Sequence, residues 1–295
     1  MVRQVTDEVY KAIENLIEVF VEQSRSELAQ RLTKWQTDLS QAEVHEVIGA
    51  HLARQHTLAR ELAQNPRIWH QHIAPMILRA MADVYISVAW ILDDPVDRAR
   101  KFVLHGLGQA KLRLEHRKEA MNGREPAPDE NAAIQALEDW IDHQRFTFLT
   151  EVNVGSWSGI STRQMAEEAG CIDFYNLVYN PFSACTHSMW HHVAVYNLKV
   201  CSNPLHRYHR IPHDPALPLD PHYVYLAGKY WQKTLSSFDR KVALQVDPPS
   251  AFNRLCGDLA KLDEFATDED DAPGARGDTQ PARSPGQPRS IDVGE

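Results

Sequence analysis

An apolar run, IAPMILRAMADVYISVAWIL at residues 73–92, constrains the fold of this chain more than any other stretch. The run has the length of a membrane-spanning helix, but Arg79 and Asp83 lie near its middle. A charged side chain at the centre of a bilayer costs on the order of 3 kcal/mol, whereas a protein core accepts charges that pair with each other. The run therefore predicts a buried helix in a soluble bundle, with no membrane partner.

The chain up to about residue 265 carries apolar residues at three- and four-residue steps, which is the period of an amphipathic helix. We find no convincing alternation of the kind that β-strands show. The pattern predicts an all-α fold, a multi-helix bundle. The expected helices cover about residues 13–35, 44–62, 76–92, 95–120, 131–150, 162–169, 172–180, 183–199, 222–244 and 249–263.

Three polar segments interrupt or follow the helical pattern. Residues 201–222 hold five prolines and predict a long, ordered surface loop. The Gly/Pro linker at residues 121–131 leaves a sub-division of the bundle open. From residue 266 the chain has almost no apolar residues, so it cannot offset the entropy cost of ordering. We expect a single helical domain at residues 1–265 and a disordered tail at residues 266–295.

Charge and cysteine content limit the function classes. The net charge of −9 argues against duplex DNA as a partner. Cys171, Cys185, Cys201 and Cys256 show no Cys-x-x-Cys spacing, which is typical of reduced thiols. The charged N-terminus, MVRQVTDEVY, does not have the pattern of a secretory signal. We therefore expect a cytoplasmic protein.

Two histidines four residues apart, His187 and His191, would share one face of the predicted helix at residues 183–199. Such a pair can bind zinc, but a zinc site needs a third and usually a fourth ligand. Position 188 is Ser, so there is no His-Glu-x-x-His motif. The sequence predicts no metal and no other cofactor.

Arg79 and Asp83 stand four residues apart on the most apolar predicted helix. Buried charges persist when they are paired and hydrogen-bonded. One interpretation is an internal ion pair that fixes the helix register. The other is a polar pocket in the bundle core, where the permanently charged Arg79 would bind a phosphate or a carboxylate.

A second set of candidates comes from the spacing of Arg and His. HEPN-type ribonucleases are small helical bundles with Arg and His separated by four to six residues. The chain has four such matches, and chance alone predicts roughly three. Of the four matches, only Arg100 and His105 lie well inside a predicted helix, which makes them the alternative candidate pair.

Several short patterns are shared with a known family. They include Arg79 on an apolar helix, the break at Asp94 and Pro95 before an Arg-rich helix, the Trp-Ser-Gly-x-Ser loop at residues 157–161, and MAEEAG at residues 165–170. Ser183 and His187 end the pattern. Residues 75–105 and 155–190 together resemble a bacterial family, domain of unknown function five-six-seven-seven.

The resemblance implies an all-helical, cytoplasmic protein without an established activity. The family tends to have Glu where this chain has Asp83. Its Ser-x-x-x-His helix resembles a feature of helical families linked to phage defence and to HEPN domains. On this basis we interpret Ser183 and His187 as one hydrogen-bonding unit, whereas His191 has no counterpart in the family.

Two functions follow as hypotheses. The favoured one is a non-catalytic module that binds an unknown protein, small molecule or RNA, with Arg79, Asp83, Ser183 and His187 in a polar core pocket. The alternative is a HEPN-like, metal-independent ribonuclease or toxin in a bacterial defence system. There, His187 or His105 would be the general base, and Arg79 or Arg100 would stabilise phosphate charge. A homodimer is left open.

Overall fold

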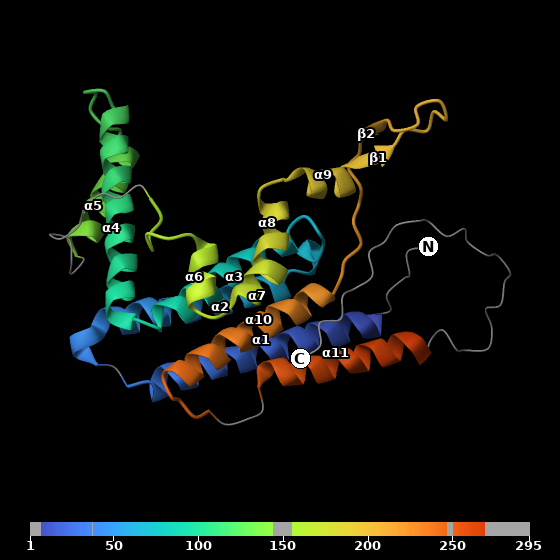
Figure 1. Cartoon of the computed structure of the whole chain (residues 1–295), viewed down its shortest axis with the longest axis horizontal. Helices are drawn as coiled ribbons and strands as arrows, with labels where there is room; N and C mark the ends of the chain where they lie inside the picture. Colours follow the sequence, from blue (N-terminus) through green and yellow to red (C-terminus); the bar gives the residue numbers. More distant parts are fainter. Residues whose placement is uncertain (1–6, 37, 144–154, 247–249, 269–295) are drawn as a thin grey trace.

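The computed structural model describes residues 7–36, 38–143, 155–246 and 250–268. Helices form most of these residues, together with two short strands (Figure 1). The predicted all-α class is confirmed. Helix α11 (Ala251–Asp268) continues past residue 266, where the tail was predicted to begin. Residues 269–295, which make up the rest of the predicted tail, lie outside the described residues.

Five long helices form the body of the molecule. They are α1 (Asp7–Lys34), α2 (Ala42–Ala63), α3 (Ala74–Ile91), α10 (His222–Lys241) and α11. Helix α10 packs against α2, α3 and α11, while α1 packs against α2 and α11 (Figure 1). All but one of the largest fully buried side chains among the described residues come from four of these helices, and full burial of one such side chain stabilises the fold by about 1.5–3 kcal/mol. These include Phe20, Ile48, Leu78, Trp231 and Phe238.

Helix α3 is the apolar run that the sequence singled out. Within the described part of the chain it is the one helix long and apolar enough to cross a membrane, and 72% of it is buried inside the fold. Pro75 lies in its first turn, where a missing N–H costs nothing. Helix α3 is enclosed by α2, α10 and α8 (Asn180–Thr186). The prediction of a buried core helix is therefore confirmed.

Close approach of α10 to α11 depends on one glycine. A Cβ atom at Gly228 would lie 2.6 Å from Leu255 Cδ2 and 3.0 Å from Phe252 Cδ2. Both contacts are shorter than van der Waals separation. Gly228 thus allows α11 to cover α10 and the ring of Phe20, which lies 3.5 Å from the same position.

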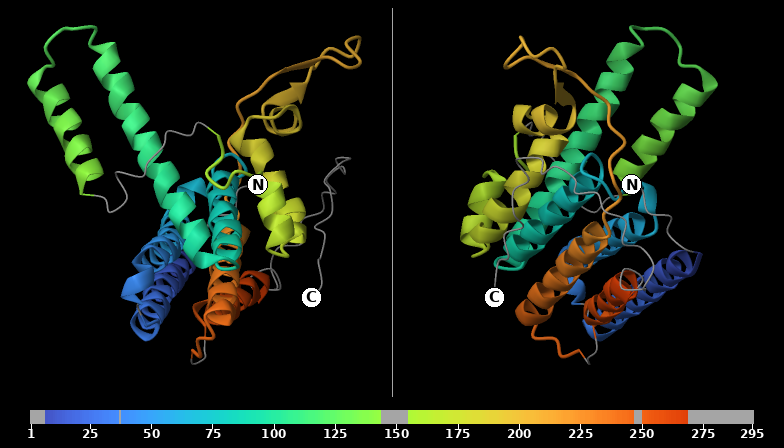
Figure 2. Two further views of the ribbon diagram at one scale, coloured as in Figure 1. Left: turned by 60° about the vertical axis from the view of Figure 1, so that its left-hand side comes forward. Right: turned by 90° about the vertical axis from the view of Figure 1, so that its right-hand side faces the viewer.

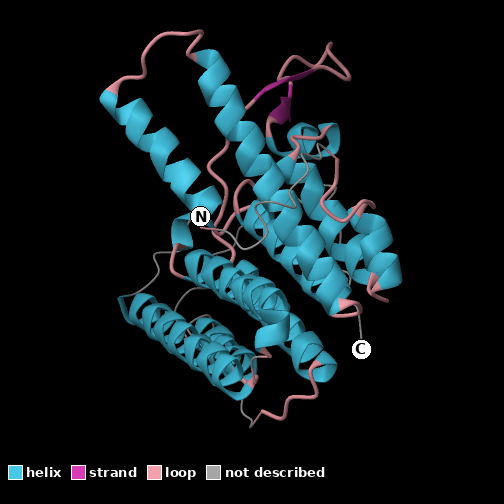
Figure 3. Cartoon of the chain, turned by 90° about the vertical axis from the view of Figure 1, so that its left-hand side faces the viewer, coloured by secondary structure: helices cyan, strands magenta, loops and turns pink. Residues whose placement is uncertain are grey.

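A helical hairpin projects from the body. It consists of α4 (Pro95–Ala120) and α5 (Pro128–Asp142), and its base packs on α2 (Figure 3). The hairpin has a small apolar cluster of its own, made by Ala110, Leu114, Ile134 and Ile141. The fifth helix was predicted at residues 131–150; it begins earlier, at Pro128, and residues 144–154 lie outside the described chain.

A second arm rises from the same side of the body (Figures 1 and 2). Its elements are α6 (Thr162–Glu168), α7 (Ile172–Phe174), a π-helical segment (Tyr175–Tyr179), α8, α9 (Trp190–Tyr196), β1 (Leu198–Val200) and β2 (Arg210–Pro212). The two strands are antiparallel, with Leu198 opposite Pro212 and Val200 opposite Arg210. Two short 3₁₀ turns elsewhere complete the described structure, at Leu39–Gln41 and Pro66–Ile68.

The prediction of one helix at residues 183–199 was wrong. Helix α8 ends at Thr186 because Ser188 takes a left-handed conformation with φ 48°. The N–H of Met189 then donates to Ala184 O at 2.9 Å and that of Ser188 to Cys185 O at 3.2 Å, which is a Schellman ending. The chain restarts as α9 and then enters β1. The absence of strands was also wrong, since β2 lies inside the predicted proline-rich loop.

Candidate functional site

Arg79 is the centre of a polar network between α3 and α8. Its Nε donates to Ser183 Oγ at 2.8 Å, and its Nη1 pairs with Asp83 one turn further along α3. Its guanidinium carbon lies 3.1 Å from the centre of the Tyr179 ring, as a cation–π contact requires. The structure thus brings Arg79, Asp83 and Ser183 together and adds Tyr179, which the sequence analysis did not assign to the site.

Ser183 has both of its hydrogen-bonding roles filled. Its hydroxyl accepts from Arg79 and donates to Tyr179 O at 2.8 Å, one helical turn back. The Tyr179 hydroxyl in turn donates to Thr162 Oγ1 at 3.3 Å, at the start of α6. A serine hydroxyl that donates to a backbone carbonyl has no proton to give to a base. This network links α3, α6 and α8.

Burial differs sharply across the ion pair. The Arg79 side chain is 12% exposed and that of Asp83 is 48% exposed. Burial raises the pKa of the Asp83 carboxyl, and the charge of Arg79 opposes that shift. Burial likewise raises the pKa of the Tyr179 hydroxyl. The pair therefore sits at the edge of the core, with the cation inside and the carboxylate reaching solvent.

His187 occupies a different position from the one its spacing suggested. It caps the C-terminus of α8, and its side chain is exposed. Its link to Ser183 is the backbone bond from His187 N–H to Ser183 O at 3.0 Å. No hydrogen bond of the His187 ring occurs among the described residues. His191 lies beyond the left-handed turn on α9, so the two histidines do not share a continuous helix.

The alternative pair, Arg100 and His105, lies on α4. Arg100 Nη2 donates to Glu43 Oε1 on α2 at 3.0 Å, and the Glu43 side chain is only 5% exposed. His105 Nδ1 is buried and has no hydrogen-bond partner within the described chain. Arg100 anchors the α4–α5 hairpin to the body, and neither residue belongs to the Arg79 network.

A family model with the description "Family of unknown function (DUF5677)" matches residues 45–203 of the 295-residue chain. The chain belongs to this family. No curated protein and no solved structure matches it. The DUF5677 match begins in α2 and ends just beyond β1, so it contains all the residues of the Arg79 network.

The DUF5677 region also contains a histidine pair that the sequence analysis missed. His72 Nδ1 lies 3.4 Å from His192 Nε2, although the two residues are 120 positions apart. The ring of Tyr196 packs against both, with centroid distances of 5.8 and 4.9 Å. Burial and the neighbouring His72 lower the pKa of His192. These contacts hold α9 against the turn that precedes α3.

Exposed apolar side chains gather on the second arm. Within the described chain, twelve large hydrophobic side chains are exposed, and six of them lie between residues 189 and 208. We call these six the apolar face. They are Met189, Trp190, Val195, Val200, Leu205 and Tyr208, with exposures from 42% to 87%. The other six are spread over the body, helix α5, the π-helical segment and the loop before α10.

The same segment has an unusual charge. Residues 174–213 contain no Asp or Glu, although the whole chain carries a net charge of −9. Lys199, Arg207 and Arg210 are exposed within it. The segment also holds six of the fifteen histidines. Residues 174–213 of the second arm are thus basic, although the protein as a whole is acidic.

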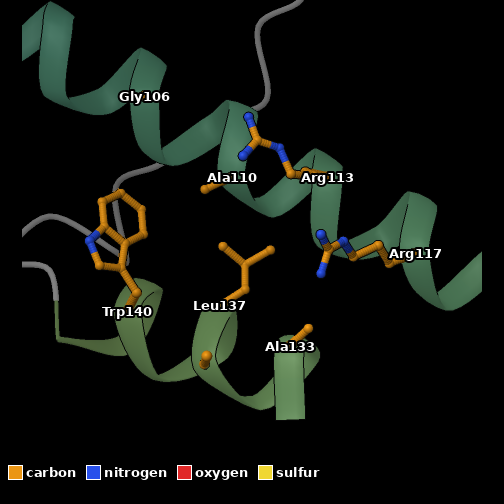
Figure 4. Close-up of a pocket in the computed structure, with 8 residues that line it drawn as sticks. Gly106, Ala110, Arg113, Arg117, Ala133, Leu137 and Trp140 are labelled. Atoms are coloured by element: carbon orange, nitrogen blue, oxygen red, sulfur yellow. The ribbon is translucent and has the colours of Figure 1, made fainter. Parts of the chain in front are cut away.

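The α4–α5 hairpin carries two shallow pockets of about 560 Å³ each. Arg113 and Arg117 line one side of the first pocket, and Leu137 points from α5 toward α4 between them and Trp140 (Figure 4). The second lies on the opposite face, along Lys111 and Glu138. Neither pocket is lined by Arg79 or His187, so these two concavities are separate from the predicted polar site.

Proposed function

We propose that the protein is a non-catalytic interaction module, and that the apolar face of the second arm binds a partner protein. The observation that carries the proposal is the concentration of six exposed large hydrophobic side chains within residues 189–208. Exposed apolar side chains that gather in one place are typical of protein–protein contact sites. Trp190 and Tyr208, at 73% and 87% exposure, are the residue types that contribute most to such interfaces.

The Arg79 network supports a structural role for the predicted site. Arg79 already binds Asp83, Ser183 and the face of Tyr179, so its charge is compensated within the fold. A ribonuclease of the HEPN-like kind would need an Arg and a base that face a phosphate in one cavity. The arrangement instead favours a cross-link that holds α8, and with it the second arm, firmly on α3.

Charge indicates the chemistry of the partner. Three exposed cations and no carboxylate within residues 174–213 favour a partner with acidic residues around an apolar centre. Single-stranded RNA would be a weaker match, because four of the six side chains are aliphatic or Met and offer bases no aromatic surface for stacking. We therefore propose a protein partner with an acidic rim.

The experiment begins with cross-linking in cells that express the full chain at native level, followed by purification of the cross-linked partner. Binding is then measured with the two purified proteins. We expect a 1:1 complex that Leu205→Ser and Trp190→Ala each weaken by roughly 30-fold, as hot-spot residues do. Leu39→Ser is the matched control, because Leu39 is 82% exposed but lies on the body. Equal loss in the control would contradict the proposal.

Charge reversal tests the acidic rim. Arg207→Glu combined with Arg210→Glu should weaken the complex, and an acidic-to-basic change on the partner should restore it. Fluorescence anisotropy with single-stranded RNA tests the competing hypothesis. If the unmodified chain binds or cleaves RNA and these variants do not, the partner is RNA and not a protein. If light scattering finds a dimer of the unmodified chain and a monomer of Trp190→Ala, the partner that binds the apolar face is a second copy of the chain.

A further inference from the structure

The hairpin between β1 and β2 brings three potential metal ligands together. Cys201 follows β1 directly, and His209 precedes β2 directly. The N–H of Cys201 donates to His209 O at 3.0 Å, which extends the strand pairing by one step. Two turns fold the loop back: His206 N–H donates to Asn203 O, and His209 N–H donates to His206 O, both at 3.0 Å. These turns place His206 next to Cys201 and His209, where the two strands end.

The ligand atoms lie at distances that suit a single ion. One atom each from Cys201, His206 and His209 all fall within 4.8 Å of one another. Cys201 Sγ is 3.7 Å from His206 Nδ1. In a tetrahedral zinc site, bonds of about 2.3 Å to sulfur and 2.0–2.1 Å to nitrogen place S and N roughly 3.5 Å apart. The ligand atoms of Cys201 and His206 are therefore close to the spacing that a bound ion requires.

We propose that Cys201, His206 and His209 bind one Zn²⁺ ion. A thiolate and two imidazoles are the borderline-soft ligands that zinc takes, whereas Mg²⁺ and Ca²⁺ require oxygen ligands. On binding, a Zn–S bond replaces the S–H bond of Cys201 and the proton goes to solvent, without any redox change. Each histidine coordinates through an unprotonated ring nitrogen. A water molecule completes the tetrahedron, as in other three-ligand zinc sites.

Asn203 shapes the turn that carries His206. Its Nδ2 lies 3.2 Å from His206 Nε2, on the ring edge opposite Nδ1. Its Oδ1 also accepts from Leu205 N–H at 3.0 Å, which fixes the amide within the turn. Because Nδ2 is a donor, its contact with Nε2 favours the tautomer of His206 with its proton on Nδ1. Coordination of zinc through Nδ1 therefore moves the ring proton to Nε2 and breaks the Nδ2 contact.

The other cysteines of the chain have different surroundings. Cys185 is buried and donates to the backbone carbonyls of Gln71 and His72. Cys171 is buried, and burial raises the pKa of its thiol to about 11. Within the described residues, the hairpin group is the one set of three or more metal-binding side chains that converges in this way. Its exposure gives an ion direct access from solvent.

A bound ion would order the tip of the hairpin. The ion closes the loop from Cys201 to His209, and Leu205, Arg207 and Tyr208 all project from that loop. The zinc site does not depend on the proposed partner, because its ligands come from one chain. The two proposals can therefore fail separately.

Cobalt titration tests the site directly. The purified full-length chain is stripped with a chelator, kept reduced, and titrated with Co²⁺ under anaerobic conditions. We expect one equivalent to bind, with the visible bands of tetrahedral cobalt and a thiolate-to-cobalt charge-transfer band, and Zn²⁺ to displace it. Cys201→Ser should abolish the charge-transfer band. His206→Ala and His209→Ala should each weaken binding by more than roughly 100-fold.

Two variants serve as controls. Cys256→Ser removes a partly exposed thiol on α11, and His213→Ala removes a histidine just beyond β2. Both should bind cobalt as the unmodified chain does, and circular dichroism should show that all variants keep the fold. Octahedral cobalt without a charge-transfer band, or unchanged binding in Cys201→Ser, would overturn the proposal. So would one ion per two chains, since that stoichiometry places the ion between copies.

Discussion

At the scale of single residues, Arg79 illustrates how one buried cation can organise several elements. It donates to Ser183, pairs with Asp83 and packs on Tyr179, and these partners come from two separate parts of the chain. Each contact neutralises part of the cost of removing a guanidinium from water. Arg79 therefore stabilises the fold only as long as its partners stay in place.

Replacement of Arg79 should destabilise the fold more than replacement of its ion-pair partner. Arg79→Ala leaves Ser183 without a donor and removes the contact with Tyr179, so we expect a loss of about 2–3 kcal/mol. In Asp83→Asn the half-exposed side chain keeps an oxygen that can accept from Arg79, and Ser183 and the Tyr179 ring still contact the guanidinium. Asp83→Asn should cost less than about 1 kcal/mol. Urea unfolding measures both, and equal losses would contradict this assignment.

His187 tests the catalytic alternative. His187→Gln should change the free energy of unfolding by less than about 0.5 kcal/mol, because the side chain is exposed. We expect no metal-independent RNA cleavage by the unmodified chain or by the variant. His192→Gln is a useful comparison, since loss of its contacts with His72 and Tyr196 should cost about 1 kcal/mol. RNA cleavage that His187→Gln abolishes would restore the ribonuclease hypothesis.

At the scale of elements, the carboxylate of Glu130 holds the loop that connects α4 to α5. Glu130 accepts from both terminal nitrogens of Arg124, at 2.6 and 2.7 Å, and from Ala127 N–H at 2.9 Å. The acceptor thus caps the first turn of α5 while it binds the loop that follows α4. Hydrogen bonds from Arg124 lower the pKa of Glu130 to about 2.

The stability that Glu130 contributes to this loop should depend on pH. A carboxyl whose pKa is lowered in the folded state contributes stability above its unfolded value, near 4.5, and loses that contribution as pH falls toward about 2. A carboxyl titration by NMR should find the Glu130 midpoint in that low range. Arg124→Gln should raise it toward the ordinary value, whereas Arg113→Gln, elsewhere on the hairpin, should not. An unperturbed midpoint in the unmodified chain would contradict the geometry.

At the scale of the whole molecule, the end of α11 separates the residues that the body needs from those that it does not need. Helix α11 covers α1 and α10, and its Leu255 is 1% exposed. The residues beyond it, 269–295, have a composition that cannot form a core. The body should therefore require the chain up to Asp268 and nothing after it.

Two truncations examine this boundary. Deletion of residues 269–295 should leave the melting temperature within a few degrees of the full chain. Deletion from Ala251 onward should destabilise the body by several kcal/mol, because it exposes the surfaces of α1 and α10 that α11 covers. Calorimetry distinguishes the two. A large loss on removal of the tail alone would show that residues 269–295 contribute to the fold.

Local features of the sequence determined the bundle. Helical periodicity placed the long helices, and the paired charges identified α3 as a core helix. Ser161, a residue type typical of helix starts, caps α6, and its Oγ accepts from Gln164 N–H at 3.1 Å. Gly170, the residue type that most easily adopts a left-handed conformation, ends α6 with φ 66°. Each of these signals acts within one or two helical turns, so it can be seen in the sequence without a fold.

Only the tertiary structure decided the sites. Gly170 and Ser188 both form Schellman endings, but only glycine is a residue type that predicts one. The ending at Ser188 therefore could not be predicted from the sequence, and the expected helix at residues 183–199 is instead α8, α9 and a strand. Arg79 and Ser183 meet across 104 positions, and His72 and His192 across 120. Contacts between residues so far apart depend on how whole helices pack, which local periodicity does not encode. The convergence of Cys201, His206 and His209 likewise required a hairpin that the sequence pattern did not predict.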